Sequence, residues 1–180
     1  MPVRFDRHPP MRPFRALTLM LLAVGGNALA DDAVREHLAP PGWESSYHDI
    51  HYSPVVRIGD RVIVSGIPAI EGDTEEARIR WAFAQLKRHL ETTGASMEDV
   101  VELQSFHVAR DHAEFRQRIA IVLKVHAEFF QDRYPAWTAV GTTALYSEGA
   151  PMEIRAEALI GSGRDARVAI PGARKSASEH

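Results

Sequence analysis

Hydrophobic residues recur at every third or fourth position in two stretches of the chain, and this spacing predicts two amphipathic helices. The first is expected from about Thr74 to Thr93 and the second from about His112 to Phe130. An acidic residue precedes each helix and a glutamate follows three positions later, which is typical of a capped helix start. These pairs are Asp73 with Glu76 and Asp111 with Glu114. Gly94 is expected to end the first helix.

Around the helices lie shorter runs rich in Val, Ile and Thr, which predict five strands. They are expected at residues 55–58, 62–65, 100–108, 136–145 and 152–160. Turn-forming residues after the first strand and before the last indicate two hairpins. The order strand, strand, helix, strand, helix, strand, strand predicts an α+β fold, with one sheet covered on one face by both helices. The other face is then left for a second subunit.

The domain boundaries follow from where this pattern begins and ends. Residues 47–160 are expected to form the folded domain. Residues 31–46, which contain a Pro-Pro-Gly turn, are expected to form a loosely attached leader segment. Residues 161–180 show no apolar period and are expected to form a disordered tail.

Residues 1–30 have the order of a secretory signal peptide. Four arginines between Arg4 and Arg15 precede an apolar run at residues 16–24, and Ala28-Leu29-Ala30 supplies a small-x-small cleavage site. We expect cleavage after Ala30, a periplasmic or secreted protein, and no membrane association afterwards. An uncleaved anchor is the alternative, and Met11 is a second possible start.

Charge and composition narrow the classes of function. The net charge of the chain is −3, and removal of residues 1–30, which carry four Arg and one Asp, leaves −6. An acidic domain repels phosphate backbones, so no nucleic-acid partner is expected. The absence of cysteine excludes thiol catalysis and Cys-based metal sites. The histidines do not have the spacing of three or four convergent zinc ligands, so no metal site is expected.

Several short motifs, in the correct order over about residues 50–160, resemble the RidA/YjgF (Rid, endoribonuclease L-PSP-like) family. They are Tyr52-Ser53-Pro54, Gly59-Asp60, Val64-Ser65-Gly66-Ile67-Pro68, Met97–Val108, Ala127-Glu128-Phe129-Phe130, Tyr134-Pro135-Ala136 and Met152-Glu153-Ile154. The resemblance implies a chorismate-mutase-like fold and a homotrimer with a central barrel, with small-molecule clefts between subunits. It also implies hydrolysis of reactive enamines and imines to a keto acid and ammonia, without a cofactor.

Two positions depart from the pattern of the deaminating members. Trp137 stands where the family carries the Arg that binds the substrate carboxylate, and an indole cannot replace the planar fork of a guanidinium. Arg155 stands at the position that we match to the family's water-positioning Glu. Tyr52, Ser65 and Gly66 are retained, so the predicted ligand-binding residues are Tyr52, Ser65, Gly66, Trp137 and Arg155. Arg155 and Tyr52 are the predicted catalytic residues.

Trp137 and Arg155 allow two interpretations. In the first, both line a cleft, where Arg155 supplies positive charge and Trp137 a flat face for stacking. In the second, Trp137 packs into the trimer core and Arg155 pairs with Glu153 or Glu157, which share its face of the strand.

The favoured functional hypothesis is an exported trimer that binds a small anionic or aromatic metabolite between subunits, and it leaves open whether the protein also hydrolyses a reactive imine or a related substrate. The alternative is a non-catalytic binding or sensing module on the same trimeric scaffold. An endoribonuclease is disfavoured by the export signal and the acidic charge.

Overall fold

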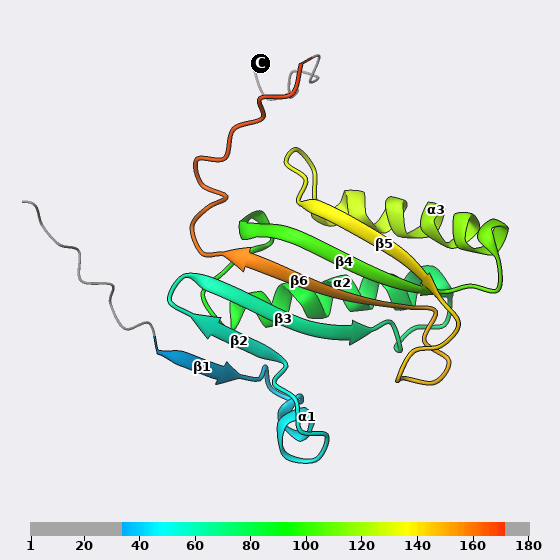
Figure 1. Ribbon diagram of the computed structural model, residues 1–180, viewed down its shortest axis with the longest axis horizontal. Coiled ribbons are helices and arrows are strands. Elements are labelled where there is room, and N and C mark those ends of the chain that lie inside the picture. The colour runs from blue at the N-terminus through cyan, green and yellow to red at the C-terminus, as the bar shows by residue number, and fades with distance from the viewer. Residues whose placement is uncertain (1–33, 172–180) are drawn as a thin grey trace, which may run out of the picture. The chain divides into compact units, whose positions relative to one another are not determined.

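The computed structural model describes residues 34–171, and the predicted signal peptide and the last nine residues of the predicted tail lie outside the described residues. The elements are β1 (Arg35–Leu38), α1 (Glu44–His48), β2 (Val55–Ile58), β3 (Arg61–Pro68), α2 (Glu75–Glu91), β4 (Val100–Val108), α3 (His112–Phe129), β5 (Ala136–Thr142) and β6 (Met152–Leu159), with a single 3-10 turn, Met97–Asp99, before β4 (Figure 1). Within residues 34–171 no helix is both long and apolar enough to cross a lipid bilayer.

The strands form one mixed sheet in the order β1-β2-β3-β6-β4-β5. All neighbours are antiparallel except β4 and β5, which are parallel and are connected through α3. Both long helices lie on the same face of this sheet, with α2 packed against β3 and β6 and α3 against β4 (Figure 1). The predicted α+β fold, a sheet with two helices on one face, is confirmed.

The two long helices form where the hydrophobic spacing predicts them. The face of α2 that carries Ile79, Phe83 and Leu86 is fully buried against the sheet. Its cap differs from the prediction by one residue, because the side chain of Thr74, not Asp73, accepts the N–H of Ala77 at 3.1 Å. The cap of α3 is as predicted, since Asp111 accepts the N–H of Glu114 at 2.9 Å.

The side chains of β6 alternate between the two faces of the sheet. Met152, Ile154, Ala156 and Ala158 are buried beneath the helices. Their alternating neighbours Glu153, Arg155 and Glu157 point to the opposite face, as the two-residue period of a strand requires. No element among residues 34–171 covers this second face in the single chain, which we call the open face.

Two elements lie in the leader segment, where the hydrophobic pattern predicts none. The strand β1 pairs antiparallel with β2, with Arg35 opposite Ile58 and Leu38 opposite Val55. The ring of Trp43, just before α1, lies 4.6 Å from the His89 ring of α2 in an edge-on arrangement. This segment therefore belongs to the folded sheet, because backbone hydrogen bonds fix a strand whose side chains show no alternation.

The beginning of the predicted disordered tail is also held in place. The Gly163 N–H donates to a carboxylate oxygen of Asp99 at 3.1 Å, and Arg133 donates to the Gly163 carbonyl at 2.6 Å. Asp99 also caps the turn before β4 through Ser96. These bonds are made by polar groups that carry no hydrophobic signal, so the apolar pattern does not predict them.

A histidine lies in the middle of the core. His107 of β4 is fully buried, its Nε2 lies 2.8 Å from the Ser105 hydroxyl, and its ring packs edge-on against Phe115 of α3. Burial and, to a smaller extent, the Arg118 guanidinium lower the pKa of His107 to about 4, against a smaller opposing effect of Glu75. The folded protein therefore favours the neutral form of the His107 imidazole.

This pKa predicts a loss of stability in acid. The unfolded chain binds a proton at His107 below its ordinary pKa of 6.5, whereas the folded chain does so only near 4. The free energy of unfolding therefore falls as the pH drops through this window. In a His107→Gln variant, which keeps a partner for Ser105 but cannot titrate, Tm measured by calorimetry should fall by about 3–6 °C less between pH 7 and pH 4. An equally steep fall in both proteins would contradict the assignment, since His89 and His126 titrate in both.

Candidate functional site

A cavity of about 400 Å³ opens where β3 and β6 meet the segment around α1. This volume is typical of sites for small molecules. Three of the residues predicted from the sequence, Tyr52, Ser65 and Gly66, line it together with Glu153. The other lining residues are Trp43, Ser46, Ile50, Pro68, Ile70, Tyr146 and Ser147.

A shift in strand register places Glu153 over Gly66. Between β3 and β6, Val64 pairs with Ala156 and Ile67 with Ile154, so three steps on β3 face two on β6. The extra residue is accommodated at Ser65-Gly66, and irregularities of this kind are common beside active sites. A methyl group added to Gly66 would overlap the carboxylate of Glu153 and lie 2.6 Å from its carboxyl carbon. Only glycine at position 66 therefore allows this approach.

Glu153 is the one acidic group of the cavity. Its side chain is half-buried, and this burial raises its pKa above the ordinary value of 4.5. The hydroxyl of Ser65 donates to the Ser53 carbonyl at 2.7 Å, so its oxygen remains available as an acceptor. The site therefore combines a half-buried carboxyl of raised pKa with a hydroxyl oxygen that can accept a hydrogen bond.

Another part of the lining comes from the segment that was predicted to be a leader. Trp43, Ser46 and Ile50 line the cavity from in and around α1. The Tyr52 N–H donates to the Ser46 carbonyl at 3.0 Å. Between them, His51 adopts a left-handed backbone conformation with φ of 67°, which is uncommon for a residue other than glycine. This turn brings the chain from α1 back to Tyr52.

Trp137 does not line this cavity in the single chain. It pairs with Leu103 in the parallel β4–β5 ladder and faces the helices. Its ring lies parallel to that of His126 of α3, with centroids 5.0 Å apart, and its indole N–H donates to the Ser105 hydroxyl at 2.9 Å.

Arg155 also lies outside the cavity, on the open face of the sheet. Its guanidinium donates to Gln104 and to Glu157, both at 3.3 Å. The pairing with Glu157 corresponds to the second interpretation of the sequence. Within one subunit, Trp137 and Arg155 therefore point to opposite faces of the sheet, and a shared cleft would require side chains from two subunits.

Glu153 is not among the residues predicted from the sequence, because position 155 was matched to the family's carboxylate. In the structure, Glu153 pairs with Pro68 and lies next to Gly66, where the register of β3 and β6 shifts. The signal that could have found it is the glycine inside a β-rich run, which often marks a bulge or a close approach.

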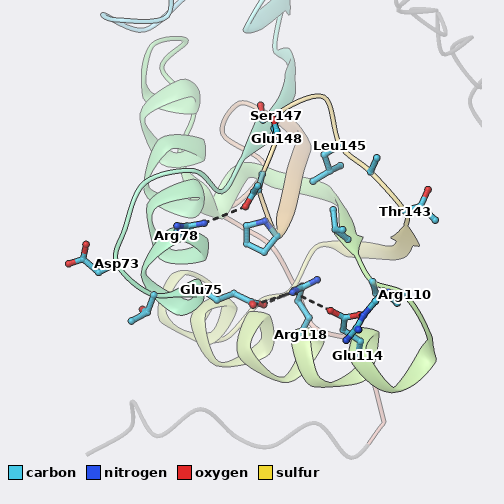
Figure 2. A pocket seen from close by; sticks show the side chains of 17 residues that line it. Asp73, Glu75, Arg78, Arg110, Glu114, Arg118, Thr143, Leu145, Ser147 and Glu148 are labelled. Atoms are coloured by element: carbon cyan, nitrogen blue, oxygen red, sulfur yellow. Dashed lines mark hydrogen bonds and ion pairs between the residues drawn. The ribbon is translucent and has the colours of Figure 1, made fainter.

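A larger cavity, of about 660 Å³, lies between the starts of α2 and α3 and the loop that follows β5 (Figure 2). Its arginines already have partners. Arg118 donates to both oxygens of Glu75 at 2.6 and 3.2 Å, Arg110 pairs with Glu114 at 2.9 Å, and Arg78 donates to two backbone carbonyls. None of the residues predicted from the sequence lines it, so we regard the smaller cavity as the candidate site.

Among residues 34–171, no group of three or more His, Asp or Glu side chains is arranged to hold a metal ion. The histidines of the core are engaged with Gln85, with Ser105 and with aromatic rings.

Known proteins resemble this chain over most of the folded region. The sequence model of the family described as Endoribonuclease L-PSP matches residues 46–160. The RutC family protein YjgH of Escherichia coli is 33% identical over 117 residues, which are 62% of this chain and 86% of that protein. A 2-iminobutanoate/2-iminopropanoate deaminase of Dermatophagoides farinae is 32% identical over 101 residues, which are 52% of this chain and 74% of the deaminase.

Solved structures agree with these sequence matches. Rv2704 of Mycobacterium tuberculosis, described as a member of the YjgF/YER057c/UK114 family, is 30% identical with a TM-score of 0.60, and the match covers 71% of this chain and 100% of Rv2704. The structure of the protein YJGH gives a TM-score of 0.61 at 30% identity and covers 70% of this chain and 96% of that protein. The chain thus belongs to the RidA/YjgF family, as its fold and the match across residues 46–160 require.

Proposed function

We propose that the chain is an exported enzyme of the RidA/YjgF family that hydrolyses reactive imines or enamines in the cavity around Glu153. The observation that carries this proposal is the half-buried carboxyl of Glu153, held against Gly66 and beside Tyr52 and Ser65. Similarity to a protein named 2-iminobutanoate/2-iminopropanoate deaminase supports the class of reaction.

Hydrolysis of an imine needs a group that first accepts a proton and then donates it. Water adds to the carbon of the C=N bond and loses a proton, and the nitrogen gains a proton before the C–N bond breaks. Imine and water thereby become a carbonyl compound and ammonia. A carboxyl with a raised pKa can accept the first proton and return it to the nitrogen, which is general acid–base catalysis. Burial gives Glu153 a raised pKa. The reaction involves no oxidation or reduction, so the proposal includes no cofactor.

The neighbouring groups hold the substrate near this carboxyl. The Ser65 oxygen, whose proton is committed to the Ser53 carbonyl, can accept a hydrogen bond from the imine nitrogen or from water. Tyr52 lines the cavity and is placed to contact the substrate. Glycine at position 66 lets both strands approach the reacting atoms.

A homotrimer is part of the proposal. The open face carries the connected side chains of Gln104, Arg155 and Glu157, and association would remove this uncovered face from water. In such an assembly Trp137, on the edge strand β5, would line the cleft from a neighbouring subunit, as the family resemblance implies. The catalytic role predicted for Arg155 stays a prediction, because its guanidinium is bonded away from Glu153.

Export of the enzyme rests on the sequence of residues 1–30, which has the order of a signal peptide. The acidic charge of the remaining chain opposes binding to RNA, so the reaction that we propose is not the one in the family's description.

Replacement of Glu153 by Gln should remove the activity. Ammonia release from imines generated in situ should fall about 10²- to 10⁴-fold, the range for a lost acid–base group. Ligand-induced thermal shifts together with undetectable turnover in the wild-type protein would contradict the enzyme and favour the binding module.

The same variant should be more stable than the wild-type protein at high pH. Because burial raises the pKa of Glu153 above its unfolded value of 4.5, ionisation of this carboxyl in the folded state lowers stability as the pH rises through that interval. Glutamine does not ionise, so Tm of Glu153→Gln should exceed that of the wild type at pH 8, and the difference should shrink towards pH 4.5. A constant difference would contradict a raised pKa.

Gly66→Ala should lower the rate about 10- to 100-fold while Tm stays close to the wild-type value, because the added methyl displaces the flexible end of Glu153. The matched control is Gly141→Ala, where the new methyl would make an ordinary 3.5 Å contact with Phe115. Equal rates in the two variants would exclude the proposed contact.

The trimer is tested by light scattering of the purified protein lacking residues 1–30. The expected mass is three times that of the chain. Arg155→Glu, which places like charges beside Glu157, should shift the mass towards the monomer. A monomeric wild-type protein at micromolar concentration would exclude the intersubunit cleft.

A further inference from the structure

The lining of the candidate site is mostly apolar. Six of its side chains are aromatic or aliphatic, namely Trp43, Ile50, Tyr52, Pro68, Ile70 and Tyr146. Three of them are exposed in the single chain, Ile50 at 46%, Ile70 at 45% and Tyr146 at 85%. Exposed apolar side chains gathered around one cavity are typical of a surface that binds an apolar group.

The lining residues include a negative group and no positive one. Glu153 is the single carboxylate, and no Lys, Arg or His is among the lining residues. The nearest guanidinium on the same strand, that of Arg155, is bonded to Gln104 and Glu157 on the open face. A ligand carboxylate in this cavity would therefore meet Glu153 without a compensating cation, and an unpaired buried charge is strongly unfavourable.

Position 137, which the family resemblance places at the second wall of the cleft in a trimer, does not supply the cation either. The residue there, in place of the family's carboxylate-binding Arg, is a tryptophan whose indole N–H is already committed to Ser105. Its ring is stacked on His126, whose pKa is lowered by burial and which is therefore neutral at pH 7.

We propose that the cavity selects imines that carry an aryl or alkyl group and no carboxylate, the products of oxidation of primary amines. This inference rests on the hydrolase function proposed above and assigns its class of substrate. The imine R–CH=NH and water give the aldehyde R–CHO and ammonia, with Glu153 accepting the proton of water and returning it to nitrogen. The side chain R lies against Trp43, Tyr52 and Tyr146, and the protonated imine nitrogen faces Glu153.

The test uses two imines that differ only in the carboxylate. Phenylethylamine with a flavin amine oxidase gives the aldimine, and phenylalanine with an amino-acid oxidase gives the matching 2-imino acid. Ammonia release above the uncatalysed rate is measured for both with the purified, signal-free protein. The expected result is a kcat/KM at least about tenfold higher for the aldimine, since uncompensated charge is rejected at least that strongly.

A variant should weaken the preference without disturbing the core. Tyr146 is highly exposed and lines the cavity, so Tyr146→Arg adds a cation at its mouth. It should raise kcat/KM for the 2-imino acid several-fold and lower it for the aldimine. Ile170→Arg, on an exposed residue outside the lining, adds the same charge and should change neither value.

The outcomes separate this inference from the function on which it rests. Turnover of the 2-imino acid at an equal or higher rate would overturn the inference and leave the hydrolase standing. If neither imine is turned over, calorimetry with phenylethylamine and phenylalanine decides the ligand class. Tighter binding of the amine would support the selection while the hydrolase fails, and equal or weaker binding would overturn both.

Discussion

The candidate site depends on one contact, the approach of the Glu153 carboxyl to the backbone of Gly66. This contact exists because β3 carries one more residue than β6 between Val64 and Ile67, and because position 66 has no side chain. The same register shift brings Ser65 to the cavity and leaves the buried side of β6 undisturbed. A glutamate is thereby taken partly out of water without a cation beside it, which is unfavourable for stability and useful for proton transfer.

The alternation along β6 links this site to the rest of the molecule. Its small and branched residues pack beneath the two helices, so the intervening positions must face the other way. Glu153 lies at the cavity, while Arg155 and Glu157 form hydrogen bonds and an ion pair further along the open face. One strand therefore supplies the core, the site and the surface that we assign to the trimer.

The sequence predicted the parts of the fold that leave a periodic signal. Both long helices and the central strands were recovered from hydrophobic spacing, and the family followed from short motifs. The strand β1 was missed because its residues are held by backbone bonds to β2 and not by an apolar face. As a result Trp43 and Ile50, which wall the cavity, were assigned to a loose leader segment.

The candidate site was only partly predictable, since residue spacing does not reveal a bulge. Tyr52, Ser65 and Gly66 were identified, whereas Glu153 was passed over in favour of Arg155, two positions along the same strand. The face on which Trp137 lies was equally hidden, because it depends on parallel pairing with Leu103 across β4. Sequence motifs locate the strands of such a site, but strand register decides which side chains meet.

Trp137 does not only lack the positive charge of the family's arginine, because its side chain also takes part in the packing between β5 and α3. Its ring fills the space between β5 and α3 on His126, and its N–H bonds Ser105, which also contacts the buried His107. A guanidinium there would place a charge beside two imidazoles whose pKa values burial already lowers, which is unfavourable. The packing of this core therefore opposes a carboxylate-binding cation at position 137, and the selection that we propose, for substrates without a carboxylate, rests on the same contacts that stabilise α3 against the sheet.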